Sequence, residues 1–330
     1  MFSLTQVVDM NRVRIILTAL IAGFPVLGLA AQLLVLNKGD ATLSFIDPTS
    51  GKTSATLRTG DSPHEIELSS DGQLAFVSNY GAEVAGNTLS VIDVKAHTER
   101  KRVDLAALRR PHGLAFSAGH LFLTSEESRR IARYDPVTQR VDWTFHTGQD
   151  GTHMILVSRD ATKLFTSNIG SNSVSLIERG ASGEWQQTVI GVGTGPEGLD
   201  QSPDGRELWS AHSRDGGISM IDLARKKVIQ TFDAKTKRSN RLKFTPDGRL
   251  VLVSDLGGGE LVILDARKRT ERARLPTGRS PTGIVVAPDG QHAYVAVSGE
   301  NRIAVIDLKS LSILKTIATG NSPDGMALTR

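Results

Sequence analysis

Three histidines occupy the same position of an internal repeat, and their residue type suits metal or ligand binding. His64, His112 and His153 stand near the start of related strings: SPHEIELSSDG, RPHGLAFSAGH and GTHMILVSRDA. In the four later repeats this position holds Glu197, Asn240, Thr282 and Asp324. Imidazole and carboxylate groups that converge on one place are typical ligands of zinc, copper and iron.

We therefore predict one divalent transition metal ion (Zn, Cu or Fe), held by His64, His112, His153 and Glu197. Two other interpretations fit the same residues. They can bind a small ligand or a protein partner without a metal, or they can hydrogen-bond neighbouring loops. The chain has no cysteine, which excludes disulfides, thiolate ligands and cysteine nucleophiles. It also has no CxxCH motif, so we expect no covalent haem.

A second set of polar residues is expected just outside the first, where the second strand of each repeat ends. Glu126, His212 and Asp255 belong to this set. Side chains of this kind commonly orient the groups that contact a ligand or metal. We expect Glu126 and His212 to orient the inner residues in this way.

Arg241 is the one cation that we expect near this acidic and imidazole-rich place. It follows Asn240 at a position where most repeats have glycine. An arginine here can bind a carboxylate or phosphate of a ligand, or it can pair with Asp255 or Glu197. The predicted ligand-binding funnel comprises Asn240, Arg241, Thr282, Asp324, Glu126, His212 and Asp255.

The repeat itself predicts how these residues are positioned. Related strings begin at residues 62, 110, 151, 195, 238, 280 and 322, and a period of about 40–45 residues is typical of four-stranded propeller blades. Each unit has an apolar strand, a turn that is often Asp-Gly, two further apolar strands and a charged fourth strand. The repeat position that holds His64, His112 and His153 would lie at the start of the innermost strand. The seven side chains at this position should therefore face one central channel.

The last repeat stops after its first strand, and the missing strands are found at the other end of the chain. LLVLNKG from Leu33 matches AFVSNYG, and LSFIDP matches LSVIDV. We therefore predict an all-β, seven-bladed β-propeller whose last blade is closed by N- and C-terminal strands. Closure of this kind leaves no open sheet edge in the ring.

The strings VSNYGAEVAGNTLSVIDV, SPDG and AYVAVSGENRIAVIDL resemble the YVTN-type propeller repeats of exported bacterial and archaeal proteins. The resemblance covers the chain after its first segment and implies a secreted or periplasmic seven-bladed ring. Related propellers include lactonases, lyases and electron-transfer subunits, and the fold does not choose among these functions.

The first segment resembles a secretory signal peptide. Arg12 and Arg14 precede an apolar run from Ile15 to Leu29, which is the arrangement of a signal sequence. An uncleaved membrane anchor is the alternative, and translation can start at Met1 or Met10. We predict a signal peptide over residues 1–31 and one propeller domain over residues 32–330. The mature chain should be periplasmic or secreted, without a membrane span.

The net charge and the distribution of basic residues indicate which classes of binding partner to expect. The formal net charge is +4, and the basic residues scatter over outer strands without interleaved aromatics, so nucleic acid is not expected. We predict an exported monomer that presents its funnel to a metal ion, a small ligand or a periplasmic protein. The alternatives are a metal-assisted lactonase or lyase and an accessory protein of periplasmic redox metabolism. Both an enzyme and a binding protein fit the sequence.

Overall fold

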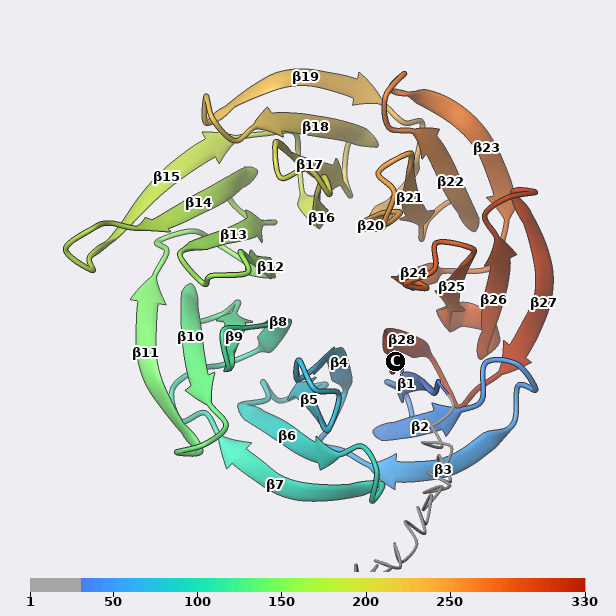
Figure 1. Ribbon diagram of the computed structural model, residues 1–330, viewed down its shortest axis with the longest axis horizontal. Helices are drawn as coiled ribbons and strands as arrows, with labels where there is room; N and C mark the ends of the chain where they lie inside the picture. The colour runs from blue at the N-terminus through green and yellow to red at the C-terminus, as the bar shows by residue number, and fades with distance from the viewer. Residues whose placement is uncertain (1–30, 330) are drawn as a thin grey trace, which may run out of the picture. The chain divides into compact units, whose positions relative to one another are not determined.

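The computed structural model describes residues 31–329, which form seven four-stranded antiparallel sheets arranged as blades around a channel (Figure 1). The predicted seven-bladed β-propeller is thereby confirmed. The predicted signal peptide lies almost wholly outside the described residues. No helix within residues 31–329 is long and apolar enough to cross a membrane.

Blades 1 to 6 follow one another along the chain, each running from the channel outward. Blade 1 contains β4 (Pro63–Leu68), β5 (Leu74–Asn79), β6 (Thr88–Asp93) and β7 (Thr98–Asp104). Blade 2 contains β8 (Pro111–Ser117), β9 (His120–Ser125), β10 (Arg130–Asp135) and β11 (Arg140–His146). Blade 3 contains β12 (Thr152–Val157), β13 (Lys163–Asn168), β14 (Ser173–Arg179) and β15 (Trp185–Gly191).

The next three blades repeat this order. Blade 4 contains β16 (Pro196–Gln201), β17 (Glu207–His212), β18 (Gly217–Asp222) and β19 (Lys227–Asp233). Blade 5 contains β20 (Ser239–Phe244), β21 (Leu250–Asp255), β22 (Glu260–Asp265) and β23 (Thr270–Pro276). Blade 6 contains β24 (Pro281–Val286), β25 (His292–Val297), β26 (Arg302–Asp307) and β27 (Ser312–Ala318), with a short 3-10 helix, η1 (Ser298–Glu300).

Blade 7 joins the two ends of the described chain. Its strands are β28 (Pro323–Leu328), β1 (Leu33–Asn37), β2 (Thr42–Ile46) and β3 (Thr53–Arg58), in that order from the channel outward. β28 and β1 pair in antiparallel fashion, with Leu34 opposite Ala327. The predicted closure of the last blade is therefore confirmed.

The apolar middle strands form the core between blades. β5, for example, is almost completely buried, whereas the outer strand β7 is mostly exposed. Phe76 of blade 1 packs with Leu121 and Tyr134 of blade 2 in one apolar cluster. Because both faces of a blade are covered by its neighbours, the middle strands are nearly continuous apolar runs.

The seven inner strands line the channel and lie close to one another. At Gly283, a Cβ atom would lie 2.1 Å from the Asp324 carbonyl oxygen of the next blade. At Gly325, it would lie 2.4 Å from the His64 carbonyl oxygen. Only glycine permits such close approach of two backbones. The glycines therefore hold the starts of neighbouring inner strands side by side.

Candidate functional site

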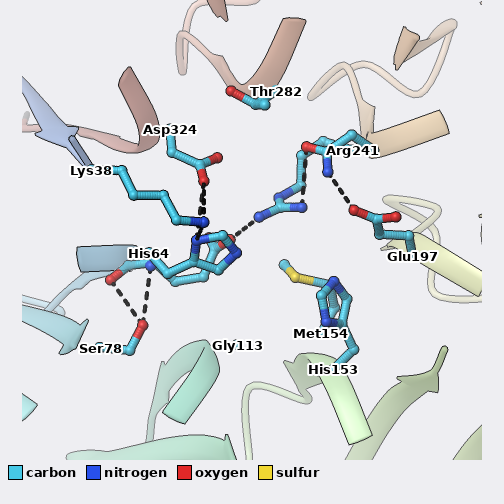
Figure 2. Close-up of polar contacts among 12 residues, drawn as sticks. Lys38, His64, Ser78, Gly113, His153, Met154, Glu197, Arg241, Thr282 and Asp324 are labelled. Atoms are coloured by element: carbon cyan, nitrogen blue, oxygen red, sulfur yellow. Dashed lines mark hydrogen bonds and ion pairs between the residues drawn. The ribbon is translucent and has the colours of Figure 1, made fainter. Parts of the chain in front are cut away.

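The second residue of every inner strand contributes to one ring at the same end of the channel (Figure 2). This ring, called the polar ring below, consists of His64, His112, His153, Glu197, Asn240, Thr282 and Asp324. Six of the seven residues are buried, and His64 is partly buried. The structure thus brings the predicted residues to one level of the channel, and most of them are shielded from solvent.

The three histidine rings lie in contact, His64 edge-on to His112 and His112 tilted against His153. The ring of His112 lies 4.2 Å from that of His64 and 3.8 Å from that of His153, centroid to centroid. Both ring nitrogens of His112 lack a hydrogen-bond partner among the described residues. The same is true of the Nε2 of His153. Burial holds the pKa of His112 well below its ordinary value, and the neighbouring His153 and His64 lower it further. His112 is therefore neutral and keeps a free lone pair.

Lys38, in the loop after β1, reaches the first histidine from blade 7. Its Nζ lies 2.6 Å from His64 Nδ1 and 3.7 Å from Asp324 Oδ2. Asp324 Oδ2 is 3.1 Å from the same His64 nitrogen. Burial by itself would raise the pKa of Asp324, but the nearby His64, Lys38 and Arg241 hold it well below its usual range. Asp324 is therefore a buried anion beside the Lys38 ammonium group and the His64 imidazole.

Tyr80 and Glu126 reach the other histidines. The Tyr80 hydroxyl donates a hydrogen bond of 2.6 Å to Glu126 Oε2, and His153 Nδ1 bonds to Glu126 Oε1. Burial opposes ionisation of Glu126, yet His153 and Tyr80 lower its pKa. Burial and the Glu126 charge raise the pKa of Tyr80, so it remains a hydrogen-bond donor. An imidazole that donates from Nδ1 to a carboxylate leaves its Nε2 free to accept or ligate.

Glu126 has this position because blade 2 has a shorter turn. β8 leads into β9 through two residues, and Ser125 stands opposite the first residue of the inner strand, as Asn79 does in blade 1. Glu126 is therefore the equivalent of Tyr80, one residue beyond the position that the sequence comparison assigned to it. This shift lets its carboxylate reach the histidine cluster.

His212 and Asp255 make loop contacts. Asp255 accepts hydrogen bonds from the backbone N–H groups of Lys237 and Arg238, at 2.9 and 2.8 Å. His212 is completely buried, and its Nδ1 lies 2.9 Å from Asp215 Oδ1. Both side chains bond to loops at the ends of blades 4 and 5, and the ligand-binding role that we predicted for them stays a prediction.

Arg241 crosses the channel. Its guanidinium extends from blade 5 toward the middle of the ring (Figure 2) and forms an ion pair with Glu65 of blade 1. It also donates to Asn240 Oδ1 at 3.3 Å, while Asn240 donates to Glu197. Burial disfavours its charge, but Glu65 and other carboxylates raise its pKa above the ordinary value. The predicted pairing with Asp255 or Glu197 is replaced by the ion pair with Glu65.

We did not predict from the sequence that Lys38 and Glu65 belong to this site, although the repeat pattern indicates both residues. Glu65 stands at the position of Arg241, where most repeats have glycine. Lys38 follows the strand end just as Tyr80 does, and Tyr80 was noticed only as a neighbour of the second set. A comparison of these two positions over all seven repeats would have found both residues.

Comparisons with known proteins place this geometry in context. The family described as cytochrome D1 heme domain matches residues 159–283. A dihydro-heme d1 dehydrogenase of Pseudomonas aeruginosa is 46% identical over 66 residues, which are 20% of this chain and 13% of that protein. The chain thus matches only a small part of this relative's length.

Solved structures share the fold. Hydrazine synthase of Kuenenia stuttgartiensis has a TM-score of 0.67 and 20% identity, covering 81% of this chain and 95% of that one. Dihydro-heme d1 dehydrogenase NirN in complex with DHE has a TM-score of 0.64 and 13% identity, covering 90% of this chain and 74% of that one. A candidate 6-phosphogluconolactonase of Bacteroides fragilis has a TM-score of 0.75 and 15% identity, covering 93% of this chain and 100% of that one.

These findings correct the predicted cofactor. We expected a Zn, Cu or Fe ion and no covalent haem, whereas the matching family is a haem domain and the matching relative is named for haem d1. Imidazole donors beside carboxylates are common to both kinds of site, so residue types alone gave the wrong cofactor. Over part of its length, the chain is therefore similar to cytochrome d1 haem domains, and its lactonase-like propeller fold is shared with proteins of other functions.

Proposed function

We propose that this protein binds an iron tetrapyrrole of the haem d1 type, without a covalent link, at the polar ring. The observation that carries the proposal is His112, a buried and neutral imidazole with no hydrogen-bond partner on either nitrogen among residues 31–329. A buried polar group without a partner is costly, and axial ligation of haem iron is a common use of a neutral histidine.

The surrounding residues fit such a group. His153 Nε2 is a second free nitrogen, because Glu126 holds the other side of the ring. Lys38 and Arg241 are cations that can exchange their present acidic partners for the carboxylates of a tetrapyrrole. When bound, the iron would supply electron-transfer or small-molecule chemistry. The chain's own residues would hold it, orient the imidazoles and exclude water.

The histidines lie outside the segment that matches the haem-domain family. Residues 159–283 include Glu197, Asn240, Arg241 and Thr282 of the site, and the histidines belong to blades 1 to 3. Sequence similarity and the histidine cluster therefore support the proposal from two different halves of the ring.

A tetrapyrrole titration tests this function. We expect haem d1, and more weakly iron protoporphyrin IX, to bind saturably with a shift of the visible absorption bands. His112→Ala should weaken binding at least tenfold, while His146→Ala, an exposed histidine on β11, should leave it unchanged. The proposal fails if no saturable shift occurs, or if both variants lose affinity equally.

Export belongs to the same proposal. We propose that the chain is delivered to the periplasm, where it serves redox metabolism as a tetrapyrrole-binding partner of another protein. The motivation is the apolar run after Arg12 and Arg14. Mass spectrometry of periplasmic protein should find a mature N-terminus between Ala30 and Leu33, and an N-terminus before residue 23 would contradict export by cleavage.

A further inference from the structure

The channel has a second compartment, on the far side of the Arg241–Glu65 pair from the polar ring. This chamber has a volume of about 740 Å³ and is lined by the inner strands of all seven blades. Glu65, Met154 and Arg241 form its inner wall, and its other end reaches the turns that follow the inner strands. Its size lies within the range of pockets that hold small organic molecules.

Three charged side chains lie at one level of the chamber wall: Glu67, Asp200 and Lys243. The equivalent positions of the other blades hold Ala115, Leu156, Val285 and Ala327. Lys243 Nζ is 3.8 Å from Asp200 Oδ1, and Asp200 Oδ2 accepts the Phe244 N–H at 2.8 Å. The charge of Lys243 is thus offset by Asp200, as that of Arg241 is by Glu65.

Glu67 has no cation in direct contact among the described residues. No ion pair within 4.0 Å joins it to another described residue. Loss of water raises the pKa of its carboxyl to about 7, although Lys243 and the Phe116 amide act in the opposite direction. The rest of the wall is largely apolar and includes Leu68, Phe116, Met154, Leu156, Met326 and Leu328.

We propose that this chamber is a second binding site, for a small organic cation with an apolar body, whose ammonium group pairs with Glu67. The cation would supply the charge that the wall lacks, and its apolar part would be buried against Phe116 and Met326. An anionic ligand would face three carboxylates and only two cations. This inference does not depend on tetrapyrrole binding at the polar ring.

Fluorescence titration with dansylcadaverine, an aromatic body on an alkyl chain that ends in an ammonium group, tests the proposal. Dansyl pentylamide, which lacks the charge, is the matched neutral probe. We expect saturable, blue-shifted binding of the ammonium probe. Because Glu67 must be ionised to pair, affinity should fall by up to about tenfold per pH unit below pH 7 and level off above it.

Glu67→Gln should weaken the ammonium probe at least tenfold and leave the neutral probe unchanged. Asp71→Asn removes an equal charge from an exposed turn that does not line the chamber and should change neither. Equal binding of the two probes, absence of binding, affinity that ignores pH, or equal losses in the two variants would each overturn the proposal.

Thermal unfolding shows whether Glu67→Gln folds stably. The folded-state pKa of Glu67 lies above the unfolded value, so its contribution is most favourable below about pH 4.5 and is lost as pH rises to about 7. At pH 5, the melting temperature of Glu67→Gln should therefore equal that of the unmodified protein or lie below it. At pH 8, the melting temperature of Glu67→Gln should lie above that of the unmodified protein.

Discussion

Side chains of the site act in pairs that join neighbouring blades. In each pair, a residue just after the second strand of one blade lies near the histidine of the next blade. The pairs are Lys38 with His64, Tyr80 with His112, and Glu126 with His153. The equivalent residues after β13, β17 and β21 are Ile169, Ser213 and Leu256. The ionisable and hydrogen-bonding side chains of these pairs therefore lie on blades 7, 1, 2 and 3.

Glu126 is the positioning residue of this set, and its removal should change the tautomer of His153. With Glu126 present, Nδ1 carries the proton and donates to the carboxylate. In Glu126→Ala, nitrogen-detected NMR of the imidazole should show both tautomers in exchange, and tetrapyrrole affinity should fall about tenfold. Glu127→Ala changes an exposed neighbouring carboxylate and should do neither. An unchanged His153 spectrum in Glu126→Ala would contradict the positioning role.

The inner strands are the elements that set the geometry of the ring. They approach so closely that in several of them the second residue, which belongs to the polar ring, is followed by glycine, as in His112-Gly113 and Asp324-Gly325. Where the side chain is larger, as in Glu65, Met154 and Arg241, it fills the channel and separates the polar ring from the chamber. The same strand position thus serves packing in some blades and the site in others.

Gly325→Ala tests this packing. The added Cβ would meet the His64 carbonyl oxygen at 2.4 Å, so β28 would have to move away from β4. We expect a loss of about 1–3 kcal/mol in the free energy of unfolding, measured with urea. Gly191→Ala, where the Cβ meets nothing within 4 Å, should change stability by less than about 1 kcal/mol. Equal stability of the two variants would show that the strands can separate freely.

At the scale of the whole molecule, the ring is held by closure at its circumference and by a contact across its centre. β28 and β1 close the circumference, and the Arg241–Glu65 pair joins blades 5 and 1. Both partners of this ion pair are largely buried, with side chains 6% and 14% exposed. Removal of one partner would therefore leave a charge with little access to water.

A double-mutant cycle measures this cross-channel contact. Glu65→Leu should lower the free energy of unfolding by about 3 kcal/mol, because it leaves Arg241 buried beside fewer carboxylates. The double variant Glu65→Leu/Arg241→Met removes both charges and should recover most of that loss. Urea unfolding at neutral pH gives both values. Strictly additive losses would mean that the two residues are not coupled.

The sequence alone determined the strands, the seven blades, the closure by both termini and the seven residues of the polar ring. These features follow from a local pattern repeated along the chain, and each repeat places its residues in the same way. The register of blade 2 was harder, because its first hairpin is two residues shorter than that of blade 1, and Ser125 instead of Glu126 takes the position of Asn79. Such shifts are decided by pairing between strands, which composition does not show.

Only the tertiary structure decided which side chains meet. The Arg241–Glu65 pair joins residues 176 positions apart, and Lys38 meets a histidine of another blade. Six residues of the polar ring are buried, and the chamber behind it is formed by the inner strands of all seven blades together. The choice of a metal ion from residue types was wrong, because an imidazole can serve a bare ion or a haem iron equally. Contacts of this kind depend on distances across the ring, and a linear pattern contains no information about them.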